Sequence, residues 1–129
     1  YTDTITKKNG GKAMYLKNED VKFESVENAR GGKGTIRKTS FLTKEEMKES
    51  SRLFGKIIIP PGCSFGYHVH EKEGEAYHIL AGKGMYNDNG TEYEVNAGDT
   101  TYTMSGCGHG IENIGDTDLE IIALILLDK

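Results

Sequence analysis

The stretch that decides the fold spans residues 62–82 and reads GCSFGYHVHEKEGEAYHILAG. His68 and His70 lie two residues apart in it. In an extended strand, residues i and i+2 point to the same face, so both imidazole rings can reach one point in space. Glu75 follows the polar segment EKEG, and we expect a hairpin turn there that returns its carboxylate to the two rings. Two imidazole nitrogens and one carboxylate oxygen in this arrangement indicate a site for a divalent transition metal.

The composition favours a single all-β domain. The chain has 129 residues, enough for one core, and we predict one domain over residues 1–129 with the barrel over residues 53–127. Seventeen glycines against two prolines indicate many tight turns. The formal net charge is −4 and the pI is about 5.6, whereas a nucleic-acid-binding domain concentrates positive charge. We therefore expect no nucleic-acid partner.

The charge is unevenly distributed along the chain. Residues 1–60 carry 13 basic and 8 acidic side chains, and residues 61–129 carry 3 basic and 12 acidic ones. This contrast favours an N-terminal segment that packs on the acidic body of its own subunit or of a neighbouring subunit. Residues 1–20 are polar and glycine-containing, and we predict a loose arm there.

Cysteine usage and hydropathy bear on the compartment. Cys63 and Cys107 are too few for a disulfide framework and lack the CxxC spacing of a zinc or redox motif. The sequence has no apolar run of 18 residues and no signal-peptide pattern. We expect a cytoplasmic protein with no membrane partner.

The rest of the chain is typical of short strands separated by turns. We expect strands at residues 21–26, 35–42 and 53–59, and a hairpin turn at Asn89-Gly90. The final run LEIIALILL, residues 119–127, suits a strand buried on both faces, by the opposing sheet or by a partner subunit. Thr43 and Glu46 form a capping box that predicts one short helix over residues 43–50. This pattern indicates a β-sandwich or barrel of the jelly-roll kind.

The spacing of the glycines and ligand-type residues resembles the two motifs of the cupin family. The matching positions are Gly62, His68, His70, Glu75 and Gly82 in the first motif, and Gly98, Gly106, His109 and Asn113 in the second. The one departure is Met104, where the family pattern has proline. The resemblance implies an all-β double-stranded β-helix, a homodimer, and metal ligation by His68, His70, Glu75 and His109. Such a ligand set suits one divalent ion of Fe, Mn, Co, Ni or Zn and leaves positions for water or a small-molecule ligand.

Other residues near the motifs have two interpretations each. Strand alternation places Tyr77 on the metal side, where its hydroxyl either meets a ligand or packs at the barrel mouth, and places His78 on the opposite face as a structural residue. Lys56 either extends to water or faces the barrel and binds a substrate carboxylate. Cys107 either fills the turn or offers a thiol beside the metal.

The segment RGGKGT, residues 30–35, does not match a phosphate-binding loop. It is either a glycine turn before a strand or a segment that brings Arg30 or Lys33 over the anionic group of a ligand.

Two functional hypotheses follow. In the first, the protein is an enzyme of the isomerase, lyase or dioxygenase kind that acts on a small polar, carboxylate- or sugar-like molecule. The metal would act as a Lewis acid or as the site for O₂ and substrate. In the second, the same site captures a small molecule without converting it. A third hypothesis, a structural module without metal, predicts no bound ion.

Overall fold

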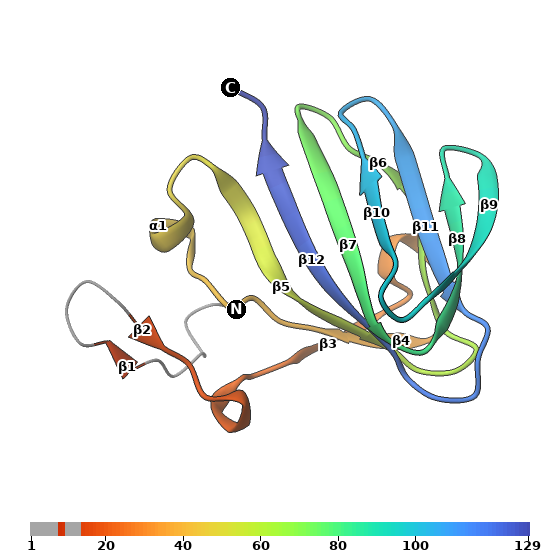
Figure 1. Cartoon of the computed structure of the whole chain (residues 1–129), viewed down its shortest axis with the longest axis horizontal. Helices are drawn as coiled ribbons and strands as arrows, with labels where there is room; N and C mark the ends of the chain where they lie inside the picture. Colours follow the sequence, from red (N-terminus) through yellow and green to blue (C-terminus); the bar gives the residue numbers. More distant parts are fainter. Residues whose placement is uncertain (1–7, 10–13) are drawn as a thin grey trace.

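Two β-sheets that face each other form the body of the protein, as the computed structural model shows (Figure 1). The structure describes residues 8–9 and 14–129. The strands in this part of the chain are β1 Lys8–Asn9, β2 Met14–Tyr15, β3 Glu24–Glu27, β4 Thr35–Lys38, β5 Ser51–Ile59, β6 Ser64–Val69, β7 Glu73–Ala81, β8 Lys83–Asp88, β9 Thr91–Asn96, β10 Thr100–Thr103, β11 Gly108–Asn113 and β12 Leu119–Leu127. The helical elements are α1 Lys44–Met47 and the 3-10 turns η2 Asn18–Asp20 and η3 Ala29–Gly31. The predicted all-β jelly roll, a double-stranded β-helix with one short helix, is confirmed.

The larger sheet has the strand order β10-β7-β12-β5-β4-β3, and the smaller one has the order β6-β11-β8-β9. The core between them contains fully buried side chains such as Ile59, Ile79 and Ile121. Because strand side chains alternate between faces, β12 buries Leu119, Ile121, Ala123 and Ile125 against the smaller sheet. Its other face, which carries Ile122 and Leu124, is half-buried. The expected burial of β12 is therefore confirmed for one face, and the partner subunit over the other face stays a prediction.

The turn signals of the sequence had different outcomes. Asn89 and Gly90 have φ values of 49° and 104° and connect β8 to β9, so the predicted hairpin is confirmed. The hairpin expected between the two strands of residues 62–82 is wrong, because β6 pairs with β11 whereas β7 pairs with β10 and β12. The segment after His70 crosses from one sheet to the other. Glu75 still returns to the histidines, because the two sheets face each other.

The short helix has the expected start. Thr43 Oγ1 accepts a hydrogen bond from the Glu46 backbone N–H, and the Glu46 carboxylate accepts one from the Thr43 N–H, which confirms the capping box. The strands expected at residues 21–26 and 35–42 correspond to β3 and to the shorter β4.

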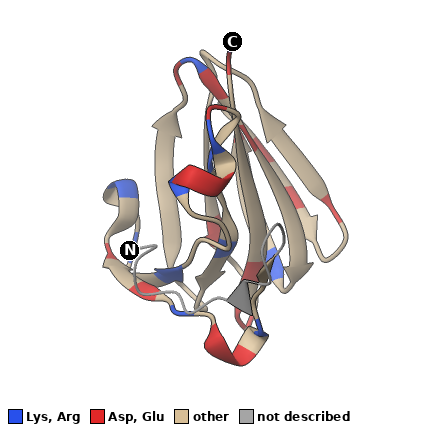
Figure 2. Ribbon diagram, turned by 90° about the vertical axis from the view of Figure 1, so that its left-hand side faces the viewer, with Lys and Arg blue, Asp and Glu red and all other residues tan. Residues whose placement is uncertain are grey.

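The loose arm predicted over residues 1–20 lies mostly outside the described residues, since residues 1–7 and 10–13 are not described. Within the described part, β1 pairs with β2 in an antiparallel register. Seen from the side that carries α1, stretches with Lys or Arg and stretches with Asp or Glu are interspersed over the ribbon (Figure 2). Among the described residues, no helix is both long and apolar enough to cross a membrane.

Candidate metal centre

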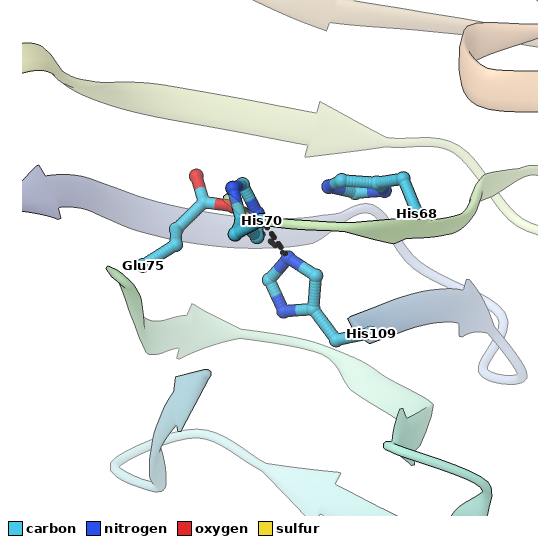
Figure 3. Close-up of side chains that lie close together, drawn as sticks. All are labelled: His68, His70, Glu75 and His109. Carbon is cyan, nitrogen blue, oxygen red and sulfur yellow. Dashed lines mark hydrogen bonds and ion pairs between the residues drawn. The ribbon is translucent and has the colours of Figure 1, made fainter. Parts of the chain in front are cut away.

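Four buried side chains converge between the two sheets, namely His68, His70, Glu75 and His109 (Figure 3). Each offers one ligand atom, and these atoms all lie within 4.8 Å of one another. The sequence motifs predicted this set of four, and the structure brings all of them together.

The sheet register explains the convergence. His109 in β11 lies directly opposite His68 in β6, and Glu75 in β7 belongs to the facing sheet. His70 follows β6, and two backbone hydrogen bonds hold it against the loop that precedes β11. The His70 N–H donates to the Cys107 carbonyl at 3.0 Å, and the His70 carbonyl accepts from the Gly106 N–H at 2.7 Å. Met104 accepts a backbone hydrogen bond from Cys107, so this loop closes its turn without the proline of the family pattern.

The distances between the ligand atoms suit a single ion. Glu75 Oε1 lies 3.0 Å from His70 Nε2 and 3.0 Å from His109 Nε2, and the two nitrogens are 3.1 Å apart. Transition metals bind such atoms at about 2.0–2.2 Å, so two ligands at right angles around one ion lie about 3 Å apart. The three atoms therefore have the spacing of neighbouring ligands around one metal.

Each of the three histidines uses its other ring nitrogen, Nδ1, to hold the ring in place. His68 Nδ1 donates to the Gly66 carbonyl at 2.7 Å, and His70 Nδ1 donates to Glu73 Oε2 at 2.6 Å. His109 Nδ1 lies 2.8 Å from the Tyr86 hydroxyl, which is also 2.8 Å from Thr103 Oγ1. Metal-ligating histidines typically have such a partner, because it fixes the tautomer and the ring orientation. The residues therefore fit a metal in their hydrogen bonding as well as in their spacing.

The electrostatics of His68 and Glu75 favour the protonation states that a metal needs. Burial lowers the pKa of His68 to about 4, so its ring is neutral near pH 7. Burial by itself raises the pKa of Glu75, but the hydrogen bonds with His109 and His70 outweigh it and lower the pKa to about 2. A neutral imidazole and an ionised carboxylate are the ligand forms that bind divalent cations.

Metal binding is expected to release protons from His70. The hydrogen bond with Glu75 raises the pKa of His70 above its usual 6.5, Glu73 acts in the same direction, and burial opposes them. A raised pKa leaves more of the ring protonated near neutral pH, and the metal requires the neutral form. Calorimetric titration of the metal-free protein with Zn²⁺, in buffers that differ in ionisation enthalpy, should show the release of up to about one proton per ion. The neutral fraction of His70 increases as the pH rises, so the number of protons released per ion should decrease. A number that does not depend on pH would contradict His70 as the source of the proton.

The remaining candidate residues are not among the four ligand groups of the centre. Of the two interpretations of Tyr77, the structure supports the packed aromatic, because Tyr77 is buried and its ring stacks on that of His109, with ring centroids 4.7 Å apart. The barrel-facing alternative for Lys56 is wrong, because Lys56 lies on the outer face of the large sheet and pairs with Glu120 at 3.2 Å. His78 is exposed on that same face, as alternation predicted, and contacts Thr100. Cys107 is not among the converging ligand groups of the described residues.

Glu73 and Tyr86, which hydrogen-bond to the rings of His70 and His109, were not predicted from the sequence. Glu73 was assigned to a polar turn, but β7 begins at this residue. Extending the alternation of Glu75 and Tyr77 two residues back would have placed Glu73 on the same face. Tyr86, on β8, carried no signal that a local pattern could reveal, because its partner His109 is 23 residues away.

A small cavity of about 80 Å³ lies beside the four residues. His68, His70 and Glu75 form one part of its wall, and Leu53, Ile57, Phe65 and Ile125 form an apolar part. Three basic side chains also line it, namely Arg30, Lys38 and Arg52. The volume is well below the roughly 300–1,000 Å³ of pockets that enclose drug-sized ligands. The cavity therefore suits a very small anionic molecule.

Two glycines bring Arg30 to this cavity. A side chain at Gly66 of β6 would overlap the Arg30 carbonyl oxygen, and one at Gly32 would overlap the Ser64 carbonyl oxygen. The absence of both side chains lets η3 lie directly on the backbone of β6. Of the two alternatives for the RGGKGT segment, the glycine turn before β4 is confirmed, and it also places Arg30 on the cavity wall. Lys33 does not line the cavity and pairs with Glu112 at 3.6 Å.

Comparisons with known proteins agree with this architecture. A family model described as the cupin domain matches residues 55–125. An oxalate-binding protein from Thermotoga maritima is 44% identical over 117 residues, which cover 91% of this chain and 97% of that protein. A crystal structure described as a predicted oxalate decarboxylase from Thermotoga maritima has a TM-score of 0.86 and 45% identity, covering 88% of this chain and 99% of that one. The structure of KdgF from Halomonas sp., at a TM-score of 0.73 and 15% identity, covers 89% of this chain and 94% of its own, and shows likeness of fold alone.

Proposed function

The chain belongs to the cupin family, and from this premise we propose that it binds a small dicarboxylate such as oxalate at a divalent metal. His68, His70, Glu75 and His109 would hold the metal, which supplies positive charge and open positions for carboxylate oxygens. The observation that carries the proposal is the presence of three basic side chains, Arg30, Lys38 and Arg52, on the wall of one small cavity beside these residues. A dianion placed there would meet the positive charge of the metal and of these side chains. The oxalate-binding relative from Thermotoga maritima supports this choice of ligand.

The cavity favours binding over conversion. Glu75 is the only carboxylate among the described residues that line it, and the proposal assigns this residue to the metal. Many isomerases, lyases and decarboxylases use a carboxylate as the group that moves a proton to or from the substrate. Glu73, the next carboxylate, is engaged by Arg52 and His70. We therefore favour the non-catalytic binding protein over the enzyme hypothesis.

Oxalate binding is expected to require both the metal and Arg30. Calorimetric titration should show oxalate binding to protein loaded with Mn²⁺, Fe²⁺, Co²⁺, Ni²⁺ or Zn²⁺, and none after the metal is removed with a chelator. Arg30 has a φ of 52°, a conformation that asparagine tolerates better than most residues, so Arg30→Asn removes the charge without new backbone strain. Loss of one charged hydrogen bond of about 1.5–3 kcal/mol should weaken oxalate binding by about 10-fold or more, with the metal content unchanged.

Two outcomes would contradict the proposal. Equal binding of oxalate with and without metal would exclude the metal-dependent site. Release of formate and CO₂ from oxalate by any metal-loaded form, measured by NMR and gas analysis, would favour the enzyme hypothesis instead. Lys33→Asn, at a basic residue of the same segment that does not line the cavity, provides the matched control and should bind oxalate normally.

A further inference from the structure

Arg52 and Glu73 form a two-bonded ion pair beside the metal centre. Arg52 Nε donates to Glu73 Oε1 and Arg52 Nη2 donates to Glu73 Oε2, both at 2.7 Å. This fork geometry is among the strongest that an arginine and a carboxylate adopt. Glu73 Oε2 also accepts the hydrogen bond from His70 Nδ1 at 2.6 Å. One carboxylate oxygen therefore joins the guanidinium group to the imidazole ring of a metal-site residue.

The pair determines how His70 is oriented. An imidazole ring can rotate about its bond to Cβ, and the bond from Nδ1 to Glu73 selects the rotation that turns Nε2 toward Glu75. Glu73 is itself buried, and a buried carboxylate without a cationic partner is strongly unfavourable. The two hydrogen bonds from Arg52 supply that cationic partner. Arg52 therefore acts on His70 through Glu73.

Arg52 has a second environment, because it also lines the cavity beside His68, His70 and Glu75. We propose that Arg52 and Glu73 are positioning residues that couple the binding of the metal to the binding of the anion. Glu73 orients His70 for the metal, Arg52 holds Glu73, and the same arginine borders the cavity that takes the anion. The metal part stands on these contacts alone, whereas the anion part rests on the proposed function. Since coupling between two binding sites is reciprocal, the anion strengthens metal binding by the same factor by which the metal strengthens anion binding.

The first experiment measures metal affinity alone, with Zn²⁺ and Mn²⁺ as probes and no anion present. Partners of metal-ligating histidines typically contribute 10–100-fold to metal affinity, so Glu73→Gln should weaken metal binding by about this factor. Arg52→Gln should also weaken it, and Arg52→Lys, which keeps the charge but loses the fork, should be intermediate. Because both residues act through one hydrogen bond to His70, the double variant should lose less than the sum of the single variants. Unchanged metal affinity in Glu73→Gln and Arg52→Gln would overturn the positioning role.

Two controls separate positioning from a general structural effect. Glu120→Gln removes the carboxylate of a lysine pair on the outer face of the same sheet and should leave metal affinity unchanged. NMR of ¹⁵N-histidine-labelled, metal-free protein should show a hydrogen-bonded proton on His70 Nδ1 that is shifted or lost in Glu73→Gln and kept in Glu120→Gln. If this signal is the same in Glu73→Gln and the unmodified protein, Glu73 does not orient His70.

The second experiment titrates oxalate into the protein saturated with metal. Arg52→Gln should weaken oxalate binding and also reduce the factor by which oxalate strengthens metal binding, whereas the control Glu120→Gln should leave both unchanged. Normal oxalate binding by Arg52→Gln would overturn the coupling while leaving the positioning role intact. If the unmodified protein binds no oxalate, the proposed function fails, and the metal titrations still decide the positioning role.

Discussion

Replacing His68 with alanine is expected to remove the bound metal and, with it, oxalate binding. His68 would supply one of four ligand atoms. Its replacement should therefore lower metal affinity by more than the roughly 10–100-fold loss that follows removal of a residue that only hydrogen-bonds to a metal ligand. Elemental analysis of the freshly isolated protein should find about one ion per chain, and of His68→Ala only traces. Oxalate titration of His68→Ala should show no binding. His68 is a suitable position because the hydrogen bond of its ring goes to a backbone carbonyl, that of Gly66, and not to another side chain.

His78→Ala provides the matched control for this substitution. His78 belongs to the same chain segment but lies exposed on the outer face of the large sheet, where it contacts Thr100. This variant should keep both its metal and its oxalate binding. Equal metal content in His68→Ala and His78→Ala would exclude the proposed ligand set, and absence of metal from the unmodified protein would favour a structural module without metal.

Replacing Asn113 with leucine is expected to destabilise the fold more than any surface change. Asn113 is 2% exposed, and its side chain makes three hydrogen bonds of 2.8 Å each. Its Nδ2 donates to the carbonyls of Ile59 and Thr117, and its Oδ1 accepts from the Gly115 N–H. Leucine has a similar size and leaves these groups without the side-chain partner. At about 1–3 kcal/mol for a buried polar group that loses its partner, we expect the free energy of unfolding to fall by about 3 kcal/mol.

Urea denaturation followed by circular dichroism would measure this loss. Asn96→Leu is the control, because Asn96 is exposed at the end of β9, and its replacement should change the free energy of unfolding by less than about 0.5 kcal/mol. Similar midpoints for the two variants would contradict the assignment of Asn113 as a buried anchor of the turn between β11 and β12.

The sequence by itself determined the fold class and the four residues of the candidate metal centre. Alternation within a strand is a local rule, so the spacing of His68 and His70 was enough to place both rings on one face. The spacing of the second motif added His109 through the family resemblance. Local turn chemistry likewise predicted the hairpin at Asn89-Gly90 and the capping box at Thr43.

Only the tertiary structure decided what surrounds those four residues. Arg52 lies 21 residues before Glu73 in the sequence, and Tyr86 lies 23 residues before His109. Arg30 reaches the cavity because two glycines let η3 lie on β6. The local patterns around Lys56 and Tyr77 allowed a place in the cavity, yet one lies on the outer sheet face and the other behind a histidine. The physical reason is that strand periodicity fixes the face of a side chain within one strand, whereas its neighbours are set by which strands pair and how the two sheets face each other.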